Sequence, residues 1–227
     1  MKKGLIITID GPSGAGKSTI ARLLAEKLGY IYIDTGAMYR GIACAAGRHN
    51  ISRPEDPGLD EFLNNLRIDF NFRDKTEVFL EGEDISGDIR MPEISMLASR
   101  LSQNRKVREF LTEKQREIGR NGGVVIEGRD TGSVVFPHAD IKFYLDAAGS
   151  ERARRRFLEL SEKGMIAQLS AVQKEMEARD RDDSQREIAP LTIPEGAVCI
   201  DTTNLDIDGV LEKILGYIKQ RGYDGGY

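Results

Sequence analysis

The feature that most constrains this chain is a glycine-rich stretch that joins an apolar run to an amphipathic one. Residues 11–19 read GPSGAGKST and contain the spacing G-x-x-x-x-G-K-[ST]. The apolar residues 5–9 precede the stretch, and the helical pattern of residues 18–28 follows it. This order predicts a phosphate-binding loop (P-loop) between a buried strand and the start of a helix.

Such a loop binds the phosphates of a nucleotide through backbone N–H groups and a helix N-terminus. Its three glycines allow backbone conformations that residues with a Cβ avoid. Lys17 is expected to reach the β- and γ-phosphates, and a hydroxyl of Ser18 or Thr19 to hold Mg²⁺. The residues predicted to bind ATP are Gly11, Pro12, Ser13, Gly14, Ala15, Gly16, Lys17, Ser18 and Thr19.

The composition indicates a soluble globular protein. The 227 residues are 40% hydrophobic and 31% charged, as in ordinary globular domains. The formal net charge of −4 argues against broad nucleic-acid binding, which usually requires a basic excess. Asp10 interrupts the apolar run after Lys2-Lys3 too early for a secretory signal, and no stretch is long enough to span a bilayer. We therefore expect neither a nucleic-acid nor a membrane partner.

The cysteines and histidines suggest no catalytic or metal-binding role. Cys44 and Cys199 lack metal-ligand spacing and lie in apolar contexts, so both are predicted to be buried thiols. Free thiols fit a reducing, cytoplasmic location. His49 and His138 both lie in turn-like contexts. The negative charge and the absence of heptads favour a monomer.

Apolar runs alternate with helical patterns along the chain, which predicts a parallel sheet flanked by helices. Continuous apolar runs, typical of buried parallel strands, occupy residues 5–10, 30–34, 124–127, 141–146 and 198–201. Helical patterns occupy residues 18–28, 37–46, 105–120, 150–163, 167–181 and 207–221. Ligands of such sheets bind outside the carboxyl ends of the strands, so the P-loop and the acidic residues that end the strands should share one crevice.

One segment breaks this alternation. Residues 67–72 and 76–80 alternate apolar and polar side chains around residues 73–75, which predicts a half-exposed β-hairpin. Helical patterns on both sides extend this insert to about residues 50–100.

Two motifs follow predicted strands. In residues 34–40 (DTGAMYR), Thr35 and Arg40 can face an acceptor phosphate at a helix start, or they form an ordinary helix cap with a surface arginine. In residues 127–132 (EGRDTG), the carboxylate of Glu127 is placed to approach Mg²⁺, directly or through water. The next two residues, an arginine and an aspartate, can bind phosphate and an exocyclic amine, or they pair with each other in a turn.

Two arginine clusters follow later in the chain. Residues 150–157 (SERARRRF) form either a mobile lid, whose arginines stabilise a transferring phosphoryl group, or a solvated helix face neutralised by Glu151 and Glu159. Residues 179–186 (RDRDDSQR) place an aspartate and two arginines at helical spacing, or they form a solubilising helix end.

Together these motifs resemble the nucleoside monophosphate kinases, and within them the bacterial-type cytidylate kinases. The resemblance spans most of the chain in family order. It rests on GPSGAGKST, DTGAMYR, LEGEDISGDIR (80–90), ASR and KVRE (around 98–109), EGRDTGSVVFP (127–137) and RDRDDSQREIAPL (179–191).

The resemblance implies transfer of the γ-phosphoryl group of ATP to CMP or dCMP with Mg²⁺. It also implies an α/β P-loop NTPase fold, with a five-stranded parallel sheet flanked by helices, an inserted antiparallel β subdomain that binds the monophosphate, and a helical lid. The expected division is a core (1–34, 104–148, 187–221), an insert (35–103, with the hairpin at about 67–85), a lid (149–186) and a flexible tail (222–227).

Roles of single residues follow from motif position. The resemblance implies a catalytic set of Lys17, Arg129, Arg152, Arg156 and Arg179. It implies that the acceptor phosphate is held by Thr35, Arg40, Arg129 and Arg179. The cytosine would be read by Ser99, Arg108 and Asp130, and the ribose by Asp183 and Arg186. Magnesium would be held by Ser18 and Glu127, the latter through water or directly.

Two other functions stay open at this stage. A related P-loop kinase could act on UMP, dTMP or another small acceptor. Cytosine offers an N4 amine where uracil has a carbonyl, so a carboxylate at Asp130 favours CMP. A P-loop nucleotide switch is the second alternative, but the chain lacks an N-K-x-D motif, and separate arginine clusters suit two anionic substrates better than one.

Overall fold

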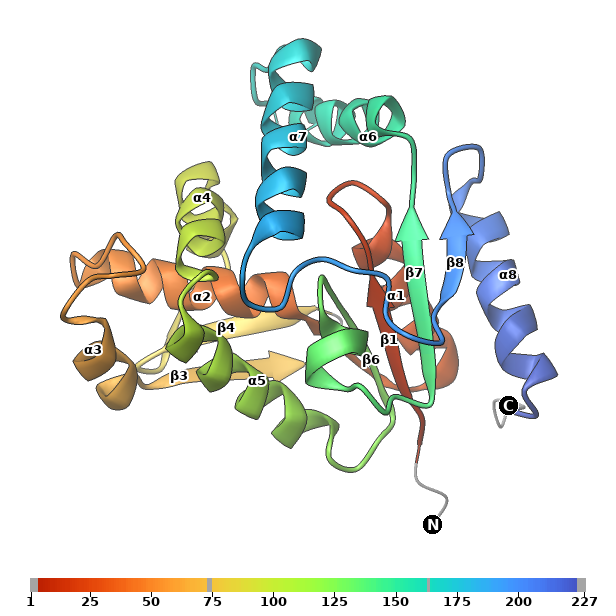
Figure 1. The fold of residues 1–227 in the computed structure, drawn as a ribbon, viewed down its shortest axis with the longest axis horizontal. Coiled ribbons are helices and arrows are strands. Elements are labelled where there is room, and N and C mark those ends of the chain that lie inside the picture. The colour runs from red at the N-terminus through yellow and green to blue at the C-terminus, as the bar shows by residue number, and fades with distance from the viewer. Residues whose placement is uncertain (1–3, 73–74, 163, 224–227) are drawn as a thin grey trace.

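A central sheet of five parallel strands carries the fold, in the order β2-β6-β1-β7-β8 (Figure 1). The computed structural model describes residues 4–72, 75–162 and 164–223. The strands are β1 (Ile6–Asp10), β2 (Ile31–Asp34), β6 (Val124–Gly128), β7 (Ile141–Asp146) and β8 (Val198–Asp201). All five predicted strands and the α/β fold class are confirmed.

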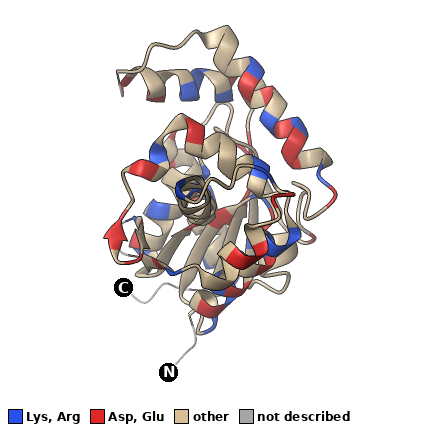
Figure 2. Cartoon of the chain, turned by 90° about the vertical axis from the view of Figure 1, so that its left-hand side faces the viewer, with Lys and Arg blue, Asp and Glu red and all other residues tan. Residues whose placement is uncertain are grey.

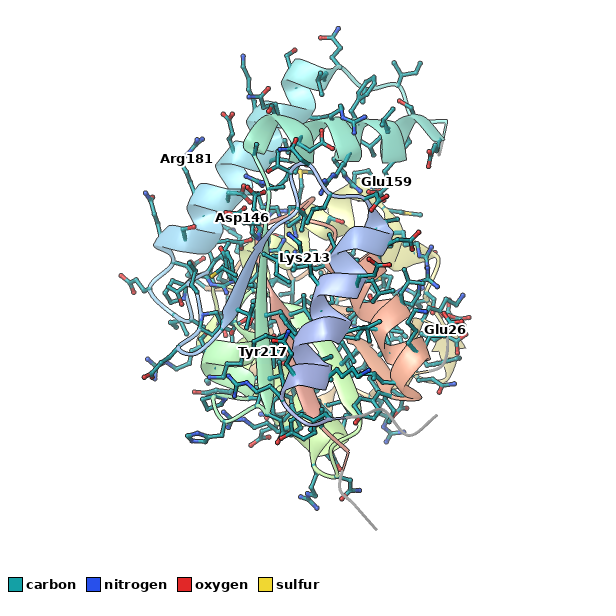
Figure 3. All side chains as sticks on the ribbon, turned by 90° about the vertical axis from the view of Figure 1, so that its right-hand side faces the viewer. Glu26, Asp146, Glu159, Arg181, Lys213 and Tyr217 are labelled. Carbon is teal, nitrogen blue, oxygen red and sulfur yellow. The ribbon has the colours of Figure 1, made fainter. Side chains whose placement is uncertain are left out.

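The sheet is covered on both faces because each buried strand sends alternate side chains to opposite sides. Val125 of β6 packs into a core with α1 (Lys17–Leu28) and α8 (Ile207–Gln220). Its neighbours Val124 and Ile126 pack into a second core. The helices of this second core include α2 (Thr35–Arg48) and α5 (Arg105–Gly119). Tyr217 of α8 meets Phe143 of β7 edge-on, with ring centroids 5.7 Å apart (Figure 3).

The insert is a three-stranded antiparallel sheet packed against α2. Strands β3 (Ile68–Phe72) and β4 (Thr76–Leu80) form the predicted hairpin, and the short β5 (Glu83–Asp84) pairs with β4. The packing is close, because a Cβ on Gly41 of α2 would lie 2.8 Å from Val78 Cγ1. Residues 73 and 74 of the predicted turn lie outside the described residues. The insert also contains α3 (Leu59–Asn65), η1 (Asp88–Arg90) and α4 (Pro92–Leu101).

Two helices stand above the carboxyl edge of the sheet, namely α6 (Gly149–Glu162) and α7 (Leu169–Gln185) (Figure 1). They share a small core of Ala153, Val172 and Met176, and acidic and basic segments alternate along both (Figure 2). The helix predicted at 167–181 begins two residues later and continues to Gln185, so Asp183 lies inside it and Arg186 caps it. Residue 163, predicted as the end of the preceding helix, lies outside the described residues.

One prediction about the thiols is wrong. Cys44 is buried, but Cys199 is exposed. The reason is the position of β8 at the edge of the sheet. Ile200 packs into the core beneath α8, so its neighbour Cys199 points to the opposite face of this edge strand, where it is exposed.

Among the helices of the described residues, none combines the length and the hydropathy needed to cross a membrane. Residues 224–227 of the predicted flexible tail and the Lys2-Lys3 pair at the start lie outside the described part of the chain.

Candidate active site

The P-loop leaves the carboxyl end of β1 and curls over the start of α1. Its glycines are required by close contacts and by left-handed backbone angles. Gly11 has φ 146°, and a Cβ there would lie 1.9 Å from the carbonyl oxygen of Leu145 on β7. Gly14 has φ 76°, and a Cβ there would lie 3.0 Å from Arg152 Cβ at the start of the lid. The loop is therefore packed between the sheet and the lid.

Lys17 turns back into this loop. Its Nζ donates a hydrogen bond of 2.7 Å to the carbonyl of Pro12, and only 5% of the residue is exposed. Burial, followed by the positive charge of Arg129, lowers the pKa of Lys17 to about 7. A polyphosphate in the loop would favour its charged form.

Ser18 and Glu127 meet beside the loop. Ser18 Oγ donates a 2.5 Å hydrogen bond to Glu127 Oε1 at the end of β6, and the Tyr32 hydroxyl donates to the same oxygen at 3.3 Å. Burial and the nearby Asp34 raise the pKa of Glu127. A hydroxyl and a carboxylate side by side at a phosphate site fit Mg²⁺, which binds few protein oxygens and keeps several waters. Ser18, which follows Lys17 directly, supplies the hydroxyl of this pair.

Residues 34–40, the motif that follows β2, contact the carboxyl end of β6 through Thr35. Asp34 caps α2 by accepting a 2.8 Å hydrogen bond from the N–H of Ala37, and it pairs with Arg40 at 3.2 Å. Thr35 Oγ1 donates to the carbonyl of Glu127 at 2.8 Å. Thr35 is therefore in the first turn of the helix, two residues before the predicted helix start, with its hydroxyl held by β6.

Four cations of the P-loop, α2, the segment after β6 and α7 are close enough for their charges to interact. We call these four residues, Lys17, Arg40, Arg129 and Arg179, the cationic cluster. Arg129 Nε donates a 2.9 Å hydrogen bond to Asp183. Arg179 Nε is buried, and within the described residues it has no hydrogen-bond partner. Burial, followed by the charge of Arg129, lowers the pKa of Arg179 to about 10. The cluster therefore carries positive charge that an anion would neutralise.

A second group, which we call the paired cluster, consists of Arg108, Asp130, Asp183 and Arg186. The Arg108 guanidinium donates to Asp130 Oδ2, and both side chains are buried. Arg186 lies 3.7 Å from Asp130 and 3.6 Å from Asp183. Arg108 also donates to the carbonyl of Ser102 at 3.1 Å and lies 5.5 Å from the centre of the Tyr39 ring. The predicted base-reading and ribose-contacting residues are thus together, except for one.

Ser99 is that exception. It is half-buried on α4, where its carbonyl accepts a 2.7 Å hydrogen bond from the hydroxyl of Ser102. Among the contacts of the described side chains, none joins Ser99 to Asp130 or Arg108. The connection between Ser99 and Arg108 is indirect and runs through Ser102, because the guanidinium of Arg108 donates to the carbonyl of Ser102.

The lid arginines divide into different environments. Arg152 donates to the P-loop carbonyl of Ser13 at 3.0 Å and to Asp180 of α7 at 2.5 Å. Arg156 pairs with Glu159 at 2.7 Å on the exposed side of α6, as the solvated-face alternative predicts. Its charge still contributes to lowering the pKa of Arg179. Arg181 of α7 points outward, away from the sheet (Figure 3).

Sequence reasoning missed three side chains of this site. Asp10 at the end of β1 accepts three hydrogen bonds from Thr131 and Gly132. Tyr32 supports Glu127, and Asp180 anchors Arg152. The strand-terminal carboxylate of Asp10 was visible in the sequence as a crevice residue, but its partners are 121 and 122 positions away.

Comparison with solved structures shows that the fold occurs in other proteins. The fold aligns with an uncharacterized protein from Eubacterium ventriosum with a TM-score of 0.54 at 14% identity, over 96% of this chain and 99% of the other. It aligns with shikimate kinase from Bacteroides thetaiotaomicron with a TM-score of 0.50 at 12% identity, over 95% and 98%. The chain therefore shares its fold with a shikimate kinase.

Sequence comparison gives the family. The profile of the cytidylate kinase family matches residues 7–220. Cytidylate kinase from Syntrophotalea carbinolica is 50% identical over 222 residues, which are 97% of this chain and 94% of the relative. Cytidylate kinase from Caldicellulosiruptor bescii is 48% identical over 216 residues, 95% of each chain. The chain belongs to the cytidylate kinase family and is therefore a phosphotransferase.

Proposed function

We propose that this chain transfers the γ-phosphoryl group of ATP to CMP or dCMP, giving ADP and the cytidine diphosphate. The observation that carries the proposal is the placement of the cationic cluster between a P-loop and the paired cluster. A single bound nucleotide would leave one of these sites unused. Two anionic nucleotides, with their phosphates meeting at Arg129 and Arg179, would use both.

In this reaction the chain mainly aligns the substrates and neutralises charge. An oxygen of the acceptor phosphate attacks the γ-phosphorus, and the bond between that phosphorus and the β–γ bridging oxygen breaks, leaving ADP. The acceptor needs little help from a base, because a phosphate monoester has a second pKa near 6 and is mostly ionised at neutral pH. Lys17 would exchange the Pro12 carbonyl for phosphate oxygens, while Arg129 and Arg179 offset the charge on the transferring group.

Ser18 and Glu127 are the residues that would hold Mg²⁺. Such an ion would supply positive charge that neutralises part of the charge of the donor phosphates. Tyr32 keeps Glu127 oriented through its hydroxyl. A cation beside Glu127 would stabilise the carboxylate that burial disfavours in the ligand-free protein.

The paired cluster supports cytosine as the acceptor base. Asp130 can accept from the N4 amine, while the Arg108 guanidinium and a hydroxyl such as that of Ser99 can donate to N3 and O2. Uracil would place a carbonyl against the carboxylate. Asp183 and Arg186 would contact the ribose once Arg129 turns to phosphate.

Three further properties complete the proposal. The chain would divide into core, insert and lid, with α6 and α7 as the part that excludes water from the transfer.

A cytoplasmic location suits the exposed, unpaired thiol of Cys199, because such thiols persist in reducing compartments. The chain would act there as a monomer. Light scattering of the purified chain tests the monomer.

A coupled ADP-release assay tests the reaction. Mg-ATP is offered with CMP, dCMP, UMP, AMP, GMP, dTMP or no acceptor in parallel. We expect fast turnover with CMP and dCMP and little with UMP. Activity with another acceptor would overturn the cytosine assignment but keep the phosphoryl chemistry. ADP release without any dependence on acceptor, together with no rise in melting temperature on adding CMP, would favour a nucleotide switch.

A further inference from the structure

Asp10 is a fully buried carboxylate at the last position of β1, with 0% of the residue exposed. Both of its oxygens accept hydrogen bonds. Oδ1 accepts from the backbone N–H and from the hydroxyl of Thr131, each at 2.8 Å, and Oδ2 accepts from the N–H of Gly132 at 2.7 Å. All three donors belong to the segment that follows β6.

That segment is placed directly after Arg129 and Asp130. Thr131 begins a single turn of π-helix, η2 (Thr131–Val135), a conformation that is rare and often found at functional sites. Gly132 is packed closely, since a Cβ there would lie 2.7 Å from Thr8 Oγ1 and 3.2 Å from Asp10 Oδ2. The position of Asp130 is thus held from its C-terminal side by β1.

The arrangement costs stability. Burial raises the pKa of Asp10 to about 6, although the hydrogen bonds from Gly132 and Thr131 favour the carboxylate. Asp10 interacts electrostatically with three titratable groups, namely Asp130, Lys17 of α1 and Tyr144 of β7. An apolar residue would leave the three donors unpaired and an amide would face one of them with like polarity, so a carboxylate is the side chain that can hold all three.

We propose that Asp10 is a positioning residue that fixes Arg129 and Asp130 relative to the P-loop, and thereby aligns the acceptor with the donor. The same residue ends the strand that leads into the P-loop and holds the start of the acceptor-binding segment. The two loops therefore share one anchor at their base. This inference rests on the proposed function, because it assigns Arg129 and Asp130 to the acceptor.

The sharpest test removes a hydrogen-bond donor to Asp10, the hydroxyl of Thr131, and changes no charged residue. Thr131→Val removes one of the three hydrogen bonds to Asp10, while Thr131→Ser keeps the hydroxyl and is the matched control. We expect Thr131→Val to weaken CMP binding about three- to tenfold, as the loss of one buried hydrogen bond would. The CMP/UMP efficiency ratio should fall by a similar factor, with the KM for ATP unchanged. Thr131→Ser should restore both values toward those of the unmodified chain.

Asp10→Asn is the stronger variant, because its amide would face the N–H of Gly132 with like polarity. It should lower the CMP/UMP ratio further than Thr131→Val. Calorimetric titration with CMP alone measures the affinity without turnover, and a thermal scan checks that each variant folds. If Asp10→Asn does not fold, the Thr131 pair still decides the question.

Equal CMP affinity in the Val and Ser variants would overturn the inference, as would an equal loss of ATP and CMP affinity in Thr131→Val. Failure of the proposed function has a different signature, namely an unmodified chain that does not phosphorylate CMP.

Discussion

The cationic cluster and the paired cluster are joined by the contact of Arg129 with Asp183, and they balance their charges to different degrees. In the paired cluster, Asp130 and Asp183 already neutralise Arg108, Arg186 and Arg129. In the cationic cluster, Arg179 leaves its Nε unpartnered among the described residues, and the pKa values of Lys17 and Arg179 are lowered. Burial also lowers the pKa of Arg186, whose Nη2 has no hydrogen-bond partner among the described residues. The contrast is therefore one of degree, because the paired cluster includes two carboxylates among its own members and the cationic cluster includes none.

The difference fits the two parts of a nucleotide. A phosphate brings negative charge, so its site can be left with excess positive charge that binding relieves. A base is neutral, so its site must keep its own charges paired and exchange hydrogen bonds when the base enters. Substitutions in the two clusters should therefore fail in different ways.

The largest effect is expected for Lys17→Met. Removal of the P-loop charge should lower kcat about 1,000-fold, because this charge acts on the transferring group. CMP affinity should change little. Steady-state kinetics and a CMP titration measure the two quantities. Comparable losses in both would mean that Lys17 also serves the acceptor.

Arg179→Met should lower kcat about 100-fold. Because the folded state disfavours the charged form of Arg179, the free energy of unfolding of the ligand-free variant should not fall. The control is Arg181→Met on the exposed side of the same helix, which should leave kcat unchanged. Urea unfolding without ligand completes the test. A destabilised Arg179→Met would contradict the picture of unrelieved charge.

Asp130→Asn tests the paired cluster. The amide can still accept through its oxygen, but Asp183 is then the one carboxylate of the paired cluster left to balance Arg108 and Arg186. We expect the CMP/UMP efficiency ratio to fall about tenfold and the ligand-free protein to lose stability. An unchanged ratio in competition assays would show that Asp130 does not read the base.

The last prediction concerns stability and not activity, because Asp10 introduces a pH dependence of the free energy of unfolding. Its pKa is about 6 in the folded chain and near 3.8 in an unfolded one. The folded state therefore holds this proton more tightly, and the free energy of unfolding should fall as pH rises from about 4 to about 6. The total is on the order of 3 kcal/mol at 1.36 kcal/mol per unit of pKa. Urea titrations of the unmodified chain and of Asp10→Asn isolate the contribution as the difference between the two curves. Parallel curves would mean that the pKa of Asp10 does not differ between the folded and the unfolded chain.

The elements of this fold were predictable where a local pattern produces them. The strands are continuous apolar runs, and the P-loop glycines sit where φ is positive. The turn of π-helix at Thr131–Val135 was not predicted, because its i→i+5 pattern depends on distant partners. Asp10 binds its start, and Arg116 of α5 donates to the carbonyls of Val134 and Val135 at its end.

The site residues show the same division. Their identity and order along the chain, from Lys17 to Arg186, came from motifs that occupy short stretches. Their pairing did not, since Arg129 finds Asp183 across 54 positions and Arg108 finds Asp130 across 22. Whether an arginine meets a carboxylate or stays unpartnered depends on which strand and helix ends come together.

The sequence by itself determined a phosphate-binding loop on a parallel α/β sheet, the antiparallel insert and the resemblance to cytidylate kinases, because each is carried by local spacing or by motif order. Only the tertiary structure decided that Arg179 is left with unrelieved charge, that Asp10 anchors the acceptor segment, and that Cys199 faces outward. Burial and charge balance are properties of the folded surroundings, and no short stretch of sequence contains those surroundings.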